Sequence, residues 1–187
     1  MSSSQIAALK FLLRIQLRRG LSKLNKKDRV RKSRKIIHAV MGRARFRSAR
    51  SLLIYAALPE EVRTRELIQK SLALGKRVFV PSVNLKKKLM EIFEIHHGTK
   101  DLKKGAYGIW EPVRRKKERP KDLDLVIVPG LGFDKRGVRL GRGEGYFDRF
   151  LKKTKCAVKW GLAFREQIVP RIPKAPHDVV MDDVLTD

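Results

Sequence analysis

A glycine-rich segment, residues 129–148, limits the possible folds of this chain more than any other feature. It directly follows the apolar run Leu125–Val128, and its glycines stand at positions 130, 132, 137, 141, 143 and 145. The apolar run is typical of a buried strand, and we expect a helix to begin near Tyr146. Glycines can adopt positive φ angles, so successive backbone N–H groups at 141, 143 and 145 can point into one concavity. The order of strand, glycine loop (residues 129–148) and helix therefore predicts a strand–turn–helix unit with an anion-binding turn.

The glycine loop also carries basic side chains that suit a phosphate group. Arg139 and Arg142 offer forked donors for phosphate or carboxylate, and the positive end of the following helix would face the same place. The loop is not a Walker A sequence, because Val138 and Arg139 stand where a P-loop has Lys-Ser/Thr, and it lacks the GxGxxG spacing of dinucleotide-binding proteins. We predict phosphate or anion binding here; the alternative is a purely structural series of turns.

Hydrophobic patterns along the rest of the chain alternate between strands and helices. We expect strands at residues 51–57, 77–81, 89–95, 124–129, 157–164 and 179–185, and helices at 4–24, 28–45, 64–75 and 146–153. Such alternation is typical of an α/β sheet that binds ligands beyond the carboxyl ends of its strands. We therefore predict that residues 1–187 form a single-domain, three-layer α/β sandwich. Its sheet should be open and mostly parallel or mixed, with helices on both faces and an exposed loop at 114–121.

The first expected helix is amphipathic. Its apolar residues recur at steps of three or four and share one face, which comprises Ile6, Leu9, Leu13, Leu17, Leu21 and Leu24. Lys10 and Arg14 stand four residues apart, so both side chains lie on one side of the helix.

The chain is unusually basic. Its 45 Lys and Arg against 19 Asp and Glu give a formal net charge of +26, spread over the whole length. Such a field attracts anionic partners such as nucleic acid, acidic membrane surfaces, nucleotides and polyglutamylated or phosphorylated small molecules. Charge alone carries no specificity, so we favour a solvated basic surface over dedicated nucleic-acid binding and expect nucleic acid only as a non-specific partner.

Cysteine content and hydropathy indicate a cytoplasmic protein. The single cysteine, Cys156, excludes an internal disulfide and fits a reducing compartment, and we expect it to be buried at the start of a strand. The longest apolar runs fall well short of the ~20 residues that span a bilayer, and the N-terminus lacks the pattern of a secretory signal. We expect a monomer with no membrane partner.

Carboxylates near the glycine loop offer a candidate metal site. Asp148 stands at the start of the expected helix, where it is either a charge that favours the helix dipole or a Mg²⁺ ligand. Asp178, Asp182 and Asp183 near the C-terminus are further candidates, although most acidic residues are only surface charges. The four histidines form no metal-ligand pattern with Cys156, and no GxSxG, HExxH or CxxC motif occurs, so hydrolase triads, zinc proteases and thiol redox chemistry have no support.

The segment VPGLGFDKRGVRLGRGEGYFDRFL closely resembles the signature of the 5-formyltetrahydrofolate cyclo-ligase family. The resemblance covers nearly the whole chain. Further matching segments are KFLLR at 10–14, AALPEEVRT at 56–64, GIWEP at 108–112, LAF at 162–164, His177-Asp178 and Asp182-Asp183-Val184. The RLGRGxGYxD string is highly specific.

This resemblance implies an ATP- and Mg²⁺-dependent enzyme. In the family, 5-formyltetrahydrofolate is cyclised to 5,10-methenyltetrahydrofolate through a phosphorylated formyl (iminium phosphate) intermediate, with release of ADP and phosphate. Such catalysis relies on positioning and charge neutralisation and needs no protein nucleophile.

The resemblance also implies roles for individual residues. Arg142 and Lys10 would be catalytic, and Asp148 and Asp178 would bind Mg²⁺. ATP would contact Lys10, Phe11, Leu12, Leu13, Arg14, Arg139, Leu140, Gly141, Arg142, Gly143, Glu144, Gly145, Tyr146 and Phe147. The folate would contact Ala56, Glu61, Trp110, Arg142, Gly143, Glu144, Gly145 and Tyr146.

Three residues depart from the family pattern. Phe147 replaces a frequent Tyr, Glu144 places a negative charge among the donors, and Ala56 is smaller than usual. Two alternatives therefore stay open: a basic nucleic-acid-binding protein on the same fold, or a paralogue that acts on a different formylated or carboxylated small molecule.

Overall fold

The computed structural model describes residues 1–187 except 85, 106–109, 114–116, 119–122 and 155. Five α-helices are described: α1 (Ser3–Ser22), α2 (Lys26–Gly42), α3 (Ala44–Ser48), α4 (Arg65–Ala73) and α5 (Tyr146–Leu151). The first six strands are β1 (Ser51–Ile54), β2 (Arg77–Asn84), β3 (Leu89–Ile95), β4 (Leu102–Lys104), β5 (Trp110–Pro112) and β6 (Lys117–Glu118). The other strands are β7 (Leu125–Val128), β8 (Gly132–Asp134), β9 (Arg139–Leu140), β10 (Val158–Leu162), β11 (Ile168–Val169) and β12 (Asp183–Leu185), and short 3-10 helices are η1 (Gly98–Asp101) and η4 (Arg165–Gln167).

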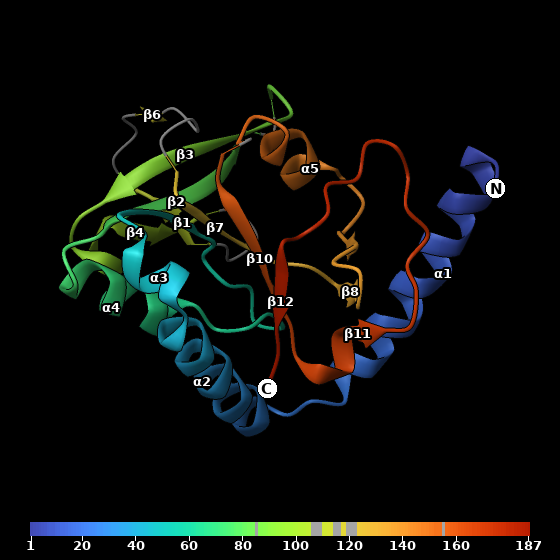
Figure 1. Cartoon of the computed structure of the whole chain (residues 1–187), viewed down its shortest axis with the longest axis horizontal. Helices are drawn as coiled ribbons and strands as arrows, with labels where there is room; N and C mark the ends of the chain where they lie inside the picture. The colour runs from blue at the N-terminus through green and yellow to red at the C-terminus, as the bar shows by residue number, and fades with distance from the viewer. Residues whose placement is uncertain (85, 106–109, 114–116, 119–122, 155) are drawn as a thin grey trace.

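The central sheet is mixed and mostly parallel, as predicted. Its strand order is β12-β10-β7-β1-β2-β3-β6 (Figure 1). The strands from β12 to β2 are parallel, whereas β3 and β6 run antiparallel to their neighbours. Leu52 of β1 pairs with Val78 of β2 on one side and with Leu125 of β7 on the other, which aligns the carboxyl ends of these three strands.

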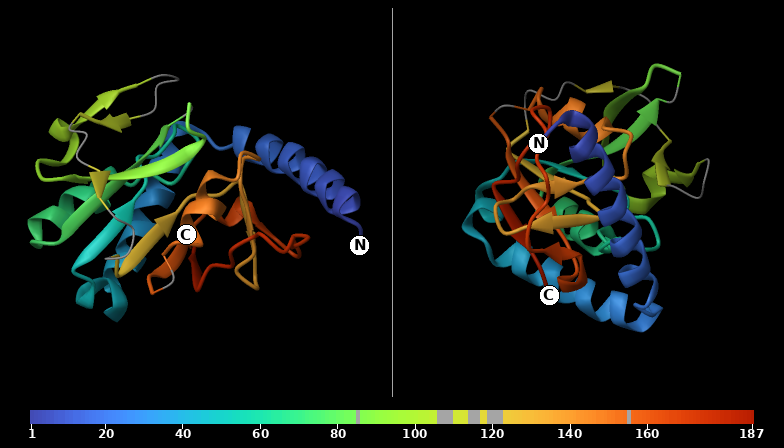
Figure 2. Two further views of the ribbon diagram at one scale, coloured as in Figure 1. Left: turned by 90° about the horizontal axis from the view of Figure 1, so that it is seen from above. Right: turned by 90° about the vertical axis from the view of Figure 1, so that its right-hand side faces the viewer.

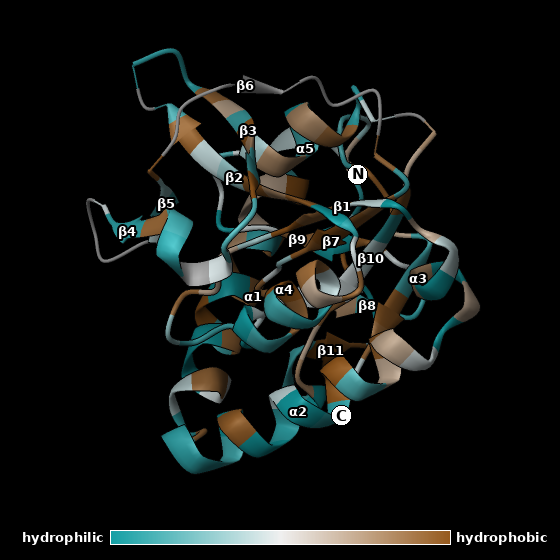
Figure 3. Cartoon of the chain, turned by 90° about the vertical axis from the view of Figure 1, so that its left-hand side faces the viewer, coloured by the Kyte–Doolittle hydropathy of each residue, from teal (hydrophilic) through white to brown (hydrophobic). Residues whose placement is uncertain are grey.

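Layers cover both faces of the sheet. All four residues of β1 are buried, as expected for a parallel strand with both faces covered. Leu52 and Ile54 belong to the core beneath α2, α3 and α4, whereas Leu53 belongs to the opposite core with α5 and β8. Hydrophobic residues accordingly concentrate on the central strands, and the outer helix turns are hydrophilic (Figure 3). The predicted three-layer α/β class is confirmed.

One layer contains an element that the sequence patterns did not indicate. A three-stranded sheet, β11-β8-β9, lies beside the central sheet, and α1 packs on it through Leu17, which contacts Val138, Leu140 and Ile172 in one buried cluster. In Figure 2, α1 extends along the side of the molecule, away from the strands β4 and β5. This packing brings the first helix to the glycine loop.

Several local predictions need correction. The apolar face of α1 is buried only at Leu17 and Leu21, whereas Leu9 is 43% exposed, because the N-terminal half of α1 extends beyond the small sheet. Cys156 is exposed rather than buried, since β10 begins only at Val158. The predicted loop at 114–121 lies outside the described residues except for β6. Within the described residues, no helix is long and apolar enough to cross a membrane.

Candidate active site

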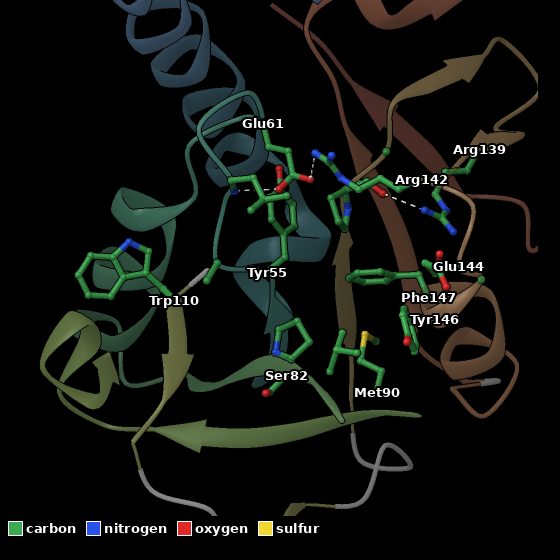
Figure 4. Close-up of a pocket in the computed structure, with 18 of the residues that line it drawn as sticks. Tyr55, Glu61, Ser82, Met90, Trp110, Arg139, Arg142, Glu144, Tyr146 and Phe147 are labelled. Atoms are coloured by element: carbon green, nitrogen blue, oxygen red, sulfur yellow. Dashed lines mark hydrogen bonds and ion pairs between the residues drawn. The ribbon is translucent and has the colours of Figure 1, made fainter. Parts of the chain in front are cut away.

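A pocket of about 320 Å³ opens at the carboxyl ends of β1, β2 and β7 (Figure 4). This is the edge where the strand pattern predicts ligand binding. Before the glycine loop, its walls comprise Tyr55, Ala56, Leu58, Glu61, Pro81, Ser82, Val83, Met90, Trp110 and Glu111. The glycine-loop side adds Pro129, Gly130, Arg139, Gly141, Arg142, Glu144, Gly145, Tyr146 and Phe147. Residues from the segment after β1, from β2, β3 and β5, and from the glycine loop therefore line one cavity.

Arg142 spans one side of this pocket. Its Nη2 donates to Glu60 Oε1 at 2.8 Å and to Glu61 Oε1 at 3.1 Å (Figure 4 draws the bond to Glu61). Burial raises the pKa of Glu61, and the bonds from Leu58 N and Arg142 only partly offset that effect. Burial opposes the charge on Arg142, but Glu61 and Glu60 together raise its pKa. The ion pair thus joins the segment after β1 to the glycine loop.

The segment after β1 holds Glu61 in place through buried hydrogen bonds. Leu58 N donates to Glu61 Oε2 at 3.0 Å. The Tyr55 hydroxyl donates to the Val62 carbonyl at 3.0 Å, and the Thr64 hydroxyl donates to the Tyr55 carbonyl. Burial raises the pKa of Tyr55 well above its ordinary value. Tyr55 therefore stays a neutral donor that fixes the turn carrying Glu61.

Arg139 forms the base of the glycine loop. Its side chain is 5% exposed, its Nη2 donates to Asp148 Oδ2 at 2.7 Å, and its Nη1 donates to the Pro129 carbonyl at 3.1 Å. The guanidinium also lies 5.7 Å from the centre of the Phe147 ring. The first turn of α5, which holds Phe147 and Asp148, is thereby tied to the end of β7.

Helix α1 contributes two cations to the far side of the loop. Lys10 forms an ion pair with Asp178, and both side chains are nearly buried. Arg14 Nε donates to the Gly141 carbonyl at 2.9 Å, so Arg14 contacts the glycine loop, whereas the partner of Lys10, Asp178, lies in the C-terminal segment beyond that loop. Asp178 Oδ2 also accepts from Ala175 N at 2.6 Å.

The glycines act in two different ways. Gly143 and Gly145 have φ angles of 123° and 65°, which L side chains rarely adopt. Gly141 does not have a positive φ, contrary to the prediction. A Cβ there would lie 2.9 Å from Arg139 Nη1, so Gly141 is needed for close approach to the pinned guanidinium.

The structure brings together much, but not all, of the predicted site. The pocket is lined by the predicted residues Ala56, Glu61, Trp110, Arg139, Gly141, Arg142, Glu144, Gly145, Tyr146 and Phe147. Phe11 and Leu12 lie outside it and are each 60% exposed, and the Leu140 side chain is buried in the cluster beneath α1. The remaining predicted residues outside the lining are Lys10, Leu13, Arg14, Gly143, Asp148 and Asp178.

Nine lining residues were not predicted from the sequence: Tyr55, Leu58, Pro81, Ser82, Val83, Met90, Glu111, Pro129 and Gly130. Most of them lie at or just beyond the carboxyl end of an expected strand. Tyr55 follows β1, and β2 continues through Pro81 to Asn84 instead of ending at Pro81.

Two carboxylates could take part in binding a metal. Among the described residues, no group of three or more His, Cys, Asp or Glu side chains could hold an ion alone. Mg²⁺ in nucleotide sites usually takes one or two carboxylates, with phosphate and water completing the shell. Asp148 Oδ1 has only a long contact, 3.5 Å from Val179 N, and Asp178 Oδ1 lies 3.8 Å from the exposed His177. Each carboxylate thus keeps one weakly engaged oxygen, which fits such a shared site.

Comparisons with known proteins agree with this geometry. The model of the 5-formyltetrahydrofolate cyclo-ligase family matches residues 6–187. The 5-formyltetrahydrofolate cyclo-ligase of Mus musculus is 33% identical over 198 aligned positions, covering 99% of this chain and 97% of the relative. That of Saccharomyces cerevisiae is 31% identical and covers 95% of each chain. The solution structure of Aquifex aeolicus 5,10-methenyltetrahydrofolate synthetase superposes with a TM-score of 0.83 at 31% identity, covering 95% of this chain and 89% of that one. The chain therefore belongs to the 5-formyltetrahydrofolate cyclo-ligase family.

Proposed function

We propose that this protein cyclises 5-formyltetrahydrofolate to 5,10-methenyltetrahydrofolate with ATP and Mg²⁺. The observation that carries the proposal is that one pocket is lined by Glu61 and Trp110 on one side and by the arginines of the glycine loop on the other. One side offers a carboxylate and apolar surface to a ring system, and the other offers cations and backbone N–H groups to phosphates. The family membership supports the same reaction.

The proposed reaction has two steps, a phosphoryl transfer and a ring closure. The formyl oxygen attacks the γ-phosphorus of ATP, the bond to the β,γ-bridging oxygen breaks, and ADP leaves. N10 then attacks the formyl carbon and loses its proton, the C–O bond breaks, and phosphate leaves as the methenyl bridge forms. Phosphorylation converts a poor leaving oxygen into a good one, so the protein has to align the reactants and neutralise charge.

Arg142 and Lys10 are the proposed catalytic cations. Arg142 borders the pocket directly, and its guanidinium can neutralise charge on the transferring phosphoryl group. Lys10 and Arg14 reach the opposite side of the glycine loop from α1. In this assignment the phosphates lie between the two sides of the loop, against the N–H groups of residues 141–146.

The other side of the pocket suits a pterin ring. Glu61 Oε1 can accept hydrogen bonds from ring N–H and amino groups, and its burial strengthens such bonds because water is excluded. Trp110, which is 39% exposed at the rim, and the small Ala56 provide apolar contact for the folate.

Asp148 and Asp178 are the proposed carboxylates for Mg²⁺. When bound, the ion would neutralise phosphate charge. Arg139 and Lys10 hold the two carboxylates beside the glycine loop. The described site gives no observation that favours nucleic-acid binding or a different formylated substrate. We further propose that the protein acts as a monomer in the cytoplasm.

An absorbance assay for methenyltetrahydrofolate tests the proposal. Purified protein is mixed with 5-formyltetrahydrofolate, and ATP and Mg²⁺ are omitted in turn. We expect product only when both are present. Product without ATP, or no product from a sample with a cooperative thermal transition, would contradict the proposed reaction.

A further inference from the structure

Arg142 has two carboxylate partners, and the assignments above use only one of them. Glu60 and Glu61 are neighbours in the segment between β1 and α4, and the same Nη2 of Arg142 donates to both. Glu61 lines the pocket, whereas Glu60 does not. We propose that Glu60 is a positioning residue that orients Arg142 toward the phosphates while Glu61 binds the pterin ring. This inference rests on the proposed function.

The division of labour follows from the atoms of Glu61. Its Oε2 accepts from Leu58 N at 3.0 Å, so Oε1 is the oxygen that both Arg142 and a ligand can reach. A carboxylate oxygen can accept two hydrogen bonds, so a ring that donates to Oε1 shares that oxygen with Arg142 and weakens the hold of Glu61 on the guanidinium. Glu60 lies outside the pocket lining, so a ligand in the pocket does not contact the partner that Arg142 meets at 2.8 Å.

The exposed fractions of the two glutamate side chains support the same division of roles. The Glu61 side chain is 10% exposed and the Glu60 side chain 38%, so Glu60 lies at the rim beside solvent. Burial of Glu60 works against its ionisation, but its backbone bond and its contact with Arg142 outweigh that effect and lower its pKa. Glu60 therefore remains a charged partner for Arg142 at neutral pH, when ligand has engaged Glu61.

The guanidinium can satisfy both sides at once. It carries five N–H donors in a rigid plane, and one nitrogen serves the two carboxylates. With Nη2 anchored on Glu60, the orientation of the whole plane is set, and the other donors can face an anion in the glycine loop. Without Glu60, Arg142 would depend on Glu61 alone and share its Oε1 with the pterin.

A double-mutant cycle tests this role. Glu60→Gln removes the charge with little change in shape, and it is measured in the wild-type and the Arg142→Ala backgrounds. Glu66→Gln is the matched control, because Glu66 is 43% exposed and pairs with Lys70 in α4, away from the pocket lining. The readouts are kcat and KM for ATP and for 5-formyltetrahydrofolate, the Kd for ATP by calorimetry, and the thermal midpoint.

We expect Glu60→Gln to lower kcat/KM for ATP by roughly threefold to tenfold. In the Arg142→Ala background the same substitution should have no further effect, since residues that act through one contact are not additive. Glu66→Gln should match the wild type. Unchanged or faster turnover in Glu60→Gln, or an equal loss in both backgrounds, would overturn the inference.

These outcomes are distinct from failure of the proposed function. If the wild-type protein forms no methenyltetrahydrofolate, the proposed reaction is wrong. The cycle is then read from the Kd for ATP, which needs no turnover: weaker binding in Glu60→Gln only when Arg142 is present supports the positioning role, and equal binding contradicts it.

Discussion

Replacing Arg142 by Ala should separate its chemical role from its structural one. In the proposed reaction the guanidinium neutralises charge that develops on the transferring phosphoryl group. Loss of one such preorganised donor typically lowers turnover by roughly 100-fold or more, which corresponds to about 2.7 kcal/mol of transition-state stabilisation. We therefore expect kcat of Arg142→Ala to fall at least that far.

The cost to folding should be much smaller. Arg142→Ala leaves Glu61, a nearly buried carboxylate, without its cation. Breaking a fully buried ion pair costs about 3–5 kcal/mol, but the Arg142 side chain is 37% exposed. Water therefore screens the pair, and a loss of about 1 kcal/mol is expected. For a chain of this size that lowers the thermal midpoint by about 2–4 °C.

The loss of turnover and the loss of thermal stability are measured on the same samples. The absorbance assay gives kcat and KM, and differential scanning calorimetry gives the midpoint. Arg142→Lys is the companion variant, because it keeps the charge but loses the planar fork that reaches two carboxylates. It should recover stability more fully than turnover. Wild-type kinetics in Arg142→Ala would remove this residue from the reaction and refute the assignment of the glycine loop to phosphates.

Three further predictions concern pH and close packing. Burial raises the pKa of Glu61 above its ordinary 4.5, so ionisation of Glu61 destabilises the fold as pH rises through the folded pKa. The thermal midpoint of Glu61→Gln should therefore rise relative to that of the wild type between pH 4 and pH 7. A difference between the two midpoints that stays constant over this range contradicts the prediction. Burial of Asp134 is outweighed by bonds from backbone N–H groups and Arg136, which lower its pKa below 3.8. The stabilisation by the Asp134 carboxylate is present above pH 3.8 and is lost as pH falls through the folded pKa. Asp134→Asn should therefore lower the free energy of unfolding in urea by about 2 kcal/mol at pH 7. An equal loss at pH 2 argues against this role of the charge. Gly141→Ala should lower kcat, because the added methyl group pushes against the Arg139 guanidinium. The control Gly20→Ala lies in α1 with open space around it, so it should add about 0.5–1 kcal/mol of stability and leave kcat unchanged. Equal kinetics in the two variants would contradict the close approach of Gly141 to Arg139.

The central sheet could be predicted from the sequence because its signals are local. The run at Leu125–Val128 and the alternation at Leu89–Ile95 each occupy one strand, and periodicity identifies strands of that length. The small sheet could not be predicted, since β9 and β11 have two residues each. Two residues show no alternation, and these strands are defined by pairing with β8 and by packing in one buried cluster with Leu17 of α1.

The site was predictable in its members but not in its pairings. The motif resemblance assigned Glu61 to the folate and Arg142 to both the ATP phosphates and the folate, but it did not indicate that the two side chains contact each other. Their contact joins residues 81 positions apart, and it exists because β1 and β7 are neighbours in the sheet. Lys10 and Asp178 are 168 positions apart and meet for a similar reason, the placement of α1 beside the glycine loop. Pairings of this kind follow from strand order, which a single sequence does not state.

The pairings also explain how so basic a protein can select its anions. Three cations at the glycine loop already have carboxylate partners, as Arg142 has Glu61, Arg139 has Asp148 and Lys10 has Asp178. The net charge of +26 attracts any anion over roughly the Debye length of ~8 Å. At the glycine loop, however, the carboxylates already fix the orientation of these cations, so an anion has to fit the donors that remain. Under the proposed function the ATP phosphates would meet those donors, and the weakly engaged oxygens of Asp148 and Asp178 would be offered to Mg²⁺.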